Sequence, residues 1–143
     1  MKIKKITFFI LIVIFSFEIY SKEINKVTYA SWDKPDVDLL FTLPKAINKN
    51  TKVLFIIHGS SRDAERYLNA WQLDAKNKNV ILVAPHFTNE YFPDYATLQM
   101  ATASGRMLKN QSNNLKNSIS SFYSFFKSKY NLESSTYRIF GFS

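Results

Sequence analysis

The fold is decided by the stretch Tyr137-Arg138-Ile139-Phe140-Gly141-Phe142-Ser143, in which a short apolar strand runs into a Gly-x-Ser turn. Such a turn is typical of a nucleophile elbow, the strand-to-helix turn of pattern G-x-S-x-G that holds a serine hydroxyl above a parallel sheet. Gly141 gives a tight turn the space it needs. The second glycine of the pattern would lie two places after the serine, outside these 143 residues. The stretch therefore predicts Ser143 as a nucleophile in a truncated pattern; the alternative is an ordinary turn residue.

The rest of the sequence alternates between strand and helix patterns. Continuous apolar runs at 53–57 and 80–84 are typical of strands covered on both faces of a parallel sheet. We also expect strands at 38–43 and 136–140, a helix beginning near Asp63, and an amphipathic helix along 115–130. This alternation predicts an α/β fold: a parallel-rich sheet with helices on both faces. The pattern gives one domain over 22–143, incomplete at the elbow, with an irregular aromatic segment at 86–111.

The first residues have the features of a signal peptide. Lys2, Lys4 and Lys5 form a positive start, and Phe8 to Phe15 is an unbroken apolar run. This run is shorter than the roughly 20 residues that a membrane-spanning helix needs. The flanks fit a cleaved secretory signal, so we expect cleavage after Ser21, leaving 22–143 in the periplasm or outside the cell. The alternative is an uncleaved anchor, which would be the chain's only contact with a membrane.

Composition excludes several other functions. The sequence has no cysteine, so disulfide scaffolds, cysteine nucleophiles and thiolate metal sites are excluded. Its two histidines and scattered carboxylates have no metal-ligand spacing, and we expect no metal and no other cofactor. The formal net charge of +8 is spread along the chain without a block of arginines and aromatics, so we expect no nucleic-acid partner. The sequence leaves the oligomeric state open.

The order of its motifs makes the sequence resemble the α/β-hydrolases. His58-Gly59-Ser60-Ser61 follows the strand at 53–57, Val-Ala-Pro-His-Phe follows at 83–87, and the Gly-Phe-Ser end follows the last strand. The resemblance covers about 38–143 and is greatest to the secreted esterase and polyhydroxyalkanoate depolymerase-like branch. It implies a fold truncated at the nucleophile elbow.

The resemblance also implies roles for single residues. Ser143 would attack an ester carbonyl, and the backbone N–H of Ser60 would be one oxyanion donor, contributing about 3–4 kcal/mol to the transition state. Gly59 would let the loop turn closely, and His58 would support that loop rather than act as base. His86 is a candidate substrate contact, although a hydrogen-bonded loop residue is the simpler interpretation. In this fold the acid and the base histidine follow the serine, so we expect neither within this chain.

The resemblance implies a serine hydrolase that acts on a small-molecule or polymeric carboxylic ester through a Ser-His-acid triad. As given, the chain would hold only the nucleophile and part of the oxyanion hole, and we expect it to be inactive alone. Two alternatives remain at this point. One is a non-catalytic exported binding protein that engages a polyanion or glycan through its basic surface and the aromatic stretch 91–95. The other is an inactive remnant of a hydrolase.

Overall fold

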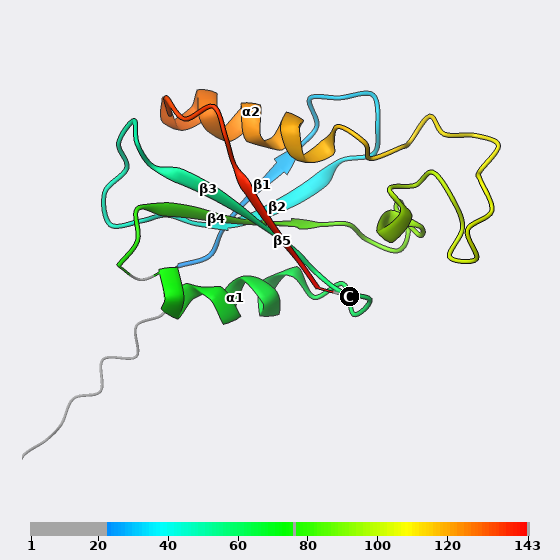
Figure 1. Cartoon of the computed structure of the whole chain (residues 1–143), viewed down its shortest axis with the longest axis horizontal. Coiled ribbons are helices and arrows are strands. Elements are labelled where there is room, and N and C mark those ends of the chain that lie inside the picture. The colour runs from blue at the N-terminus through cyan, green and yellow to red at the C-terminus, as the bar shows by residue number, and fades with distance from the viewer. Residues whose placement is uncertain (1–22, 76, 143) are drawn as a thin grey trace, which may run out of the picture.

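The computed structural model describes residues 23–142 except residue 76. Within this part, one mixed sheet has the strand order β1-β2-β4-β3-β5 (Figure 1). The strands are β1 (Asn25–Tyr29), β2 (Val37–Thr42), β3 (Lys52–Ile57), β4 (Val80–His86) and β5 (Arg138–Gly141). β3 runs parallel to both β4 and β5, whereas β2 is antiparallel to β1 and to β4. The parallel half of the sheet is therefore β4-β3-β5.

Two helices cover opposite faces of this sheet (Figure 1). α1 (Ala64–Ala75) lies on one face and α2 (Ser118–Tyr130) on the other, and a short 3₁₀ turn, η1 (Tyr95–Thr97), lies in the long segment between β4 and α2. Asp63 caps α1 because its carboxylate accepts the Arg66 N–H at 3.0 Å. The arrangement confirms the predicted α/β fold with helices on both faces.

Some predicted element boundaries were wrong. β1 was not predicted, because its exposed and half-buried side chains alternate and give no apolar run. Pro85 does not end β4 but lies inside it, opposite Leu39 of β2. The missing proline N–H is tolerated there because pairing with β3 has already ended at Val83. β5 begins at Arg138, two residues later than expected.

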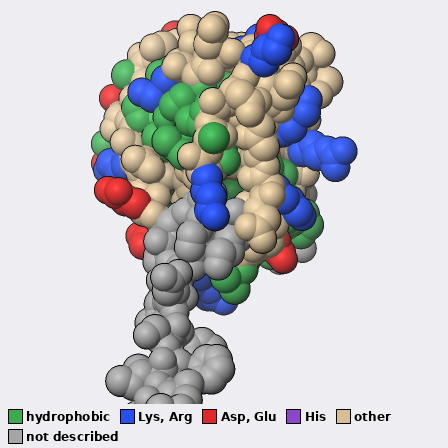
Figure 2. Space-filling view, turned by 90° about the vertical axis from the view of Figure 1, so that its left-hand side faces the viewer, with side chains coloured by type: hydrophobic (Ala, Val, Ile, Leu, Met, Phe, Trp, Pro, Cys, Tyr) green, Lys and Arg blue, Asp and Glu red, His purple; other side chains and the backbone are tan. Residues whose placement is uncertain are grey.

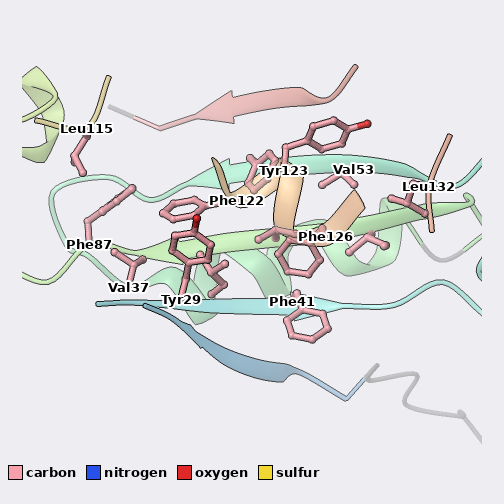
Figure 3. Close-up of a cluster of buried hydrophobic side chains, with 14 of the residues drawn as sticks. Tyr29, Val37, Phe41, Val53, Phe87, Leu115, Phe122, Tyr123, Phe126 and Leu132 are labelled. Atoms are coloured by element: carbon pink, nitrogen blue, oxygen red, sulfur yellow. The ribbon is translucent and has the colours of Figure 1, made fainter. Parts of the chain in front are cut away.

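The core on the α2 face is large and rich in aromatic side chains. Phe122 and Phe126 of α2 are fully buried, and Phe122 meets Tyr29 edge-on at a ring-centroid distance of 5.0 Å. Phe126 meets Phe41 in the same way at 5.2 Å (Figure 3). Edge-to-face pairs of this kind add about 0.5–1.5 kcal/mol each to the burial of apolar area. This core fixes α2 on the antiparallel half of the sheet as well as on β3 and β4.

The core on the α1 face is smaller and aliphatic. Its buried residues are Ile56, Ala64, Leu68, Ala75, Leu82 and Ala84. Beside it, a groove of about 800 Å³ runs between α1 and the strands β3 and β5, with Trp71, Val80 and Phe140 in its lining. At the end of the molecule where the chain enters β3 and β4, apolar side chains reach the surface and lysine or arginine side chains border them (Figure 2).

β5 forms one edge of the sheet in the described part of the chain. All four of its residues are exposed, and Ile139 retains 54% of its accessible surface. An apolar, unpaired strand edge is a template for further strand pairing. None of the helices described here is both long and apolar enough to span a bilayer.

Candidate active site

Three segments of the predicted site leave the sheet at the same edge. Because β3, β4 and β5 are parallel, the turn after Ile57, the segment after His86 and the residue after Gly141 all begin at the carboxyl ends of their strands. Ligand sites of open α/β sheets lie at this edge. The Phe142 N–H donates to the Ile57 carbonyl at 3.1 Å, and the described end of the chain lies beside the turn that follows β3 (Figure 1).

Ser143, the predicted nucleophile, lies outside the described residues, and so do the predicted signal peptide 1–21 and its cleavage site after Ser21. Phe142, the residue before Ser143, nevertheless has a defined position at the end of β5. The predicted Gly-x-Ser turn and the predicted His-Gly turn, 84 residues apart in sequence at Gly59 and Ser143, begin one hydrogen bond apart.

Gly59 lies where a side chain would not fit. A Cβ built on Gly59 would stand 2.9 Å from the Tyr67 hydroxyl oxygen and 3.8 Å from the Phe142 Cβ. The Tyr67 ring in turn packs on the Phe142 ring at a centroid distance of 4.4 Å. Glycine is therefore required by close packing at this turn rather than by an unusual backbone angle. At Gly141, by contrast, an added Cβ would meet no described atom within 4 Å.

The turn after β3 presents a free backbone donor. The Arg62 N–H closes this turn on the Gly59 carbonyl at 3.0 Å. Ser60, inside the turn, is exposed, and within the described part of the chain its backbone N–H donates no hydrogen bond. A free amide at a strand's carboxyl end is available to a substrate oxygen. The oxyanion role of Ser60 stays a prediction, because a reacting group and Ser143 are both needed to test it.

His58 is fully buried beneath this turn, and both ring nitrogens are occupied by main-chain groups. The Phe87 N–H donates to Nε2 at 3.1 Å, and Nδ1 lies 3.1 Å from the Gly59 carbonyl oxygen. These partners assign the proton to Nδ1. Burial lowers the pKa of His58 below its ordinary value, and the nearby His86 and Arg62 lower it further. In this arrangement Nε2 is not free to take a proton from a serine.

Three residues to which the sequence motifs give no role contact the turns of the candidate site. Tyr67 packs against both Gly59 and Phe142, Tyr95 donates its hydroxyl proton to the His58 carbonyl at 2.7 Å, and Arg62 reaches the segment after β4. Tyr67 occurs at a helical spacing that is equally typical of a core position, and Arg62 stands among polar turn residues. Only their contacts in the folded protein distinguish these two residues from ordinary core and turn residues. His86 ends β4 half-buried, with its ring centroid 6.2 Å from that of His58.

The candidate site has no cluster of metal-binding side chains among the described residues, and it lies apart from the groove between α1 and the strands β3 and β5. Among the described residues, no group of three or more histidine or acidic side chains is placed to hold a metal ion. The groove between α1 and β5 is lined from the opposite end of the strands, with Lys52 and Val80 in its wall. None of His58, Gly59 and Ser60 lines it. The groove and the candidate site are separate features.

Solved structures of hydrolases and esterases share this fold. Poly(aspartic acid) hydrolase-1 from Sphingomonas sp. KT-1 is 23% identical in sequence and matches 87% of this chain with a TM-score of 0.73. A poly(3-hydroxybutyrate) depolymerase from Bordetella parapertussis, 18% identical, matches 86% with a TM-score of 0.69. An acetyl xylan esterase from Aspergillus awamori, 19% identical, matches 83% with a TM-score of 0.60. The chain therefore has an α/β-hydrolase-type fold, as its sequence predicted.

This chain spans less than half the length of these structures, because the matches cover 48%, 44% and 42% of the three proteins in the same order. No protein-family model matches the sequence. No curated protein matches it significantly either. At such low sequence identities the likeness establishes the fold, and the activity has to be argued from the site.

Proposed function

We propose that the protein is a serine hydrolase of carboxylic esters, with Ser143 as nucleophile. The observation that carries the proposal is the hydrogen bond from the Phe142 N–H to the Ile57 carbonyl, which brings the residue before Ser143 to the start of the turn that contains the free amide of Ser60. A nucleophile and an oxyanion donor on neighbouring strand ends are the two parts that acyl transfer requires first. The shared fold with esterases and depolymerases supports the same reaction class.

In the proposed reaction the Ser143 hydroxyl oxygen attacks the ester carbonyl carbon while its proton passes to a general base. The carbonyl oxygen becomes the oxyanion, which the Ser60 N–H stabilises. Collapse of the tetrahedral intermediate breaks the ester C–O bond and releases the alcohol, which takes up the proton from the base, and water then hydrolyses the acyl-enzyme.

The general base is not one of the two described histidines. His58 has both nitrogens engaged, and His86 precedes the serine in the chain, whereas in this fold the acid and then the histidine follow it. We therefore propose that the base and its acid partner come from outside the described residues. A serine hydroxyl without a base is a poor nucleophile, so activity depends on them.

We further propose that the protein is exported and that its substrate is a polymeric or small ester. The basic, apolar first 21 residues support export. All three structural neighbours reported above are named for polymers, namely poly(aspartic acid), poly(3-hydroxybutyrate) and acetyl xylan, which supports testing polymers first. The segment that follows β4 contains an exposed aromatic residue, Tyr91, which suits contact with an extended chain.

The test is hydrolysis of short-chain p-nitrophenyl esters by the protein translated from its complete reading frame, compared with its Ser143→Ala variant. We expect the variant to lose at least about 10³-fold in kcat/KM. A fluorophosphonate probe should label the unmodified protein at Ser143, as located by peptide mass. Equal hydrolysis by both proteins would overturn the role of Ser143 as nucleophile. No hydrolysis and no probe labelling by the unmodified protein would overturn the hydrolase proposal and favour the binding-protein alternative.

A further inference from the structure

Arg62 occupies an unusual backbone position directly after the candidate oxyanion turn. Its φ of +57° lies in the left-handed region, where residues other than glycine are uncommon. Glycine or asparagine would adopt this conformation more easily. The backbone therefore does not explain an arginine here, and the contacts of its side chain do.

The guanidinium group of Arg62 donates hydrogen bonds to three carbonyl oxygens of one loop. Its Nη1 donates to Phe87 and to Phe92, each at 2.8 Å, and its Nη2 donates to Pro93 at 2.8 Å. The group also lies 4.6 Å from the ring centroid of Tyr95. Such a forked, planar donor suits several fixed acceptors at once, and hydrogen bonds from a charged donor are stronger than neutral ones. Within the described part of the chain, Arg62 forms no ion pair with a carboxylate.

The loop that Arg62 holds, residues 87–95, is tied to the same turn by two further hydrogen bonds. The Phe87 N–H donates to His58, and the Tyr95 hydroxyl donates to the His58 carbonyl. Inside the loop, Phe92 is fully buried while Tyr91 is exposed. The loop thus has an inner side anchored to the turn after β3 and an outer side that faces solvent. Arg62 supplies three of the five hydrogen bonds described here between the loop and the turn.

We propose that Arg62 is a positioning residue that fixes the loop 87–95 as a wall of the active site beside the Ser60 amide. The inference rests on the proposed hydrolase function for its purpose, but its physical content is independent of catalysis: one side chain supplies most of the hydrogen bonds that hold the loop to the turn. Because the wall would contact substrate while Ser60 and Ser143 carry the reaction, loosening it should weaken substrate binding more than it slows the chemical step.

The experiment measures amide hydrogen exchange by mass spectrometry in the full-length protein and in Arg62→Gln, Arg62→Lys and Arg106→Gln variants. Arg106→Gln is the matched control, because its exposed side chain forms no hydrogen bond, ion pair or ring contact with the described residues. In Arg62→Gln we expect exchange in 87–95 to rise about tenfold or more while exchange in the buried strand β3 is unchanged. Arg62→Lys should restore part of the protection, because an ammonium group donates hydrogen bonds without the planar fork.

Two results would overturn the inference: unchanged exchange in 87–95 of Arg62→Gln, or an equal rise in the loop and in β3, which would mark a general loss of stability. Ester hydrolysis then tests the functional part. KM should rise more in Arg62→Gln than kcat falls, and a kcat loss with unchanged KM would contradict the wall. If Ser143→Ala proves as active as the unmodified protein, the proposed function fails while the exchange result still decides whether Arg62 holds the loop.

Discussion

The two faces of the sheet are packed to different degrees. On the α2 face, fifteen buried residues form one cluster in which aromatic rings of α2, β1 and β2 interlock. On the α1 face, six buried residues form the cluster, three of them alanines, and a groove of about 800 Å³ lies beside it. The α2 face is thus close to a finished core, whereas the α1 face is only partly covered by the described chain.

This difference predicts how each face of the sheet responds to the loss of a buried side chain. In a closely packed core, neighbouring side chains cannot move to fill a cavity, so its full free-energy cost remains. Beside a groove, neighbouring side chains have room to move into the cavity and lower that cost. The candidate site belongs to neither face, because it lies at the carboxyl edge of β3, β4 and β5. Its parts are held by hydrogen bonds and ring contacts between loops rather than by either core.

The largest effect is expected from Phe122→Ala on the α2 face. Phe122 is fully buried, and its ring meets the rings of Tyr29 at 5.0 Å and Trp32 at 5.3 Å. Removing it should lower the free energy of unfolding by about 3–5 kcal/mol, measured by urea denaturation. Leu73→Ala, at a side chain that is 72% exposed on α1, is the control and should change it little.

A smaller loss is expected from Leu68→Ala on the α1 face. Leu68 is fully buried in the aliphatic cluster with Ile56 and Leu82. The loss should be about 2–3 kcal/mol, the lower part of the range for buried leucines, because the adjoining groove allows relaxation. If Leu68→Ala proves as destabilising as Phe122→Ala, the two faces are equally well packed and the comparison fails.

The sequence predicted the central strands well because their signals are local. Continuous apolar runs mark β3 and β4, and the Gly-x-Ser stretch marks the end of β5. β1 escaped prediction because only Tyr29 among its residues is buried, and its pairing with β2 comes from the partner strand rather than from its own pattern.

For the candidate site, the sequence placed the turns but not the contacts that hold them. Alternating strands and helices imply parallel strands, and the carboxyl ends of neighbouring parallel strands lie side by side. The proximity of Gly59 and Phe142, which follow β3 and β5, is therefore expected from the sequence. The roles of Arg62, Tyr67 and Tyr95 depend on which side chains meet across loops far apart in sequence. No periodicity carries that information. The role of Ser143 itself remains a prediction.

The contact between Gly59 and Tyr67 predicts an intermediate effect within the site. Gly59→Ala would place a Cβ 2.9 Å from the Tyr67 hydroxyl oxygen, so we expect a loss of about 1–3 kcal/mol in the free energy of unfolding. Adding Tyr67→Phe should recover most of that loss, because the next ring atom, Cζ, lies at an ordinary 3.7 Å. Gly141→Ala, where a Cβ meets no described atom within 4 Å, is the matched control.

The recovery by Tyr67→Phe is the decisive part of this cycle. If the double variant is no more stable than Gly59→Ala alone, the loss arises from the backbone of the turn, and the close packing described above is not its cause. If Gly141→Ala costs as much as Gly59→Ala, the two glycines are required for the same reason, which the contacts of the described residues do not provide.

The smallest effect is a pH dependence that originates at His58. Burial lowers the pKa of His58 in the folded protein, so the unfolded chain binds the proton more readily. The contribution of neutral His58 to the free energy of unfolding is therefore complete above the pKa of histidine in the unfolded chain, about 6.5, and declines as the pH falls below it. Protonation would also place a second N–H at Nε2 against the Phe87 N–H, which loosens the loop 87–95 at its first anchor. Melting temperatures between pH 8 and pH 5 should fall for the unmodified protein and less for His58→Gln. An NMR titration of the His58 ring in the unmodified protein gives the same answer without a variant. A pKa at or above about 6.5 would show that burial does not determine the pKa of this histidine. The pH dependence of stability would then have to originate elsewhere than at His58.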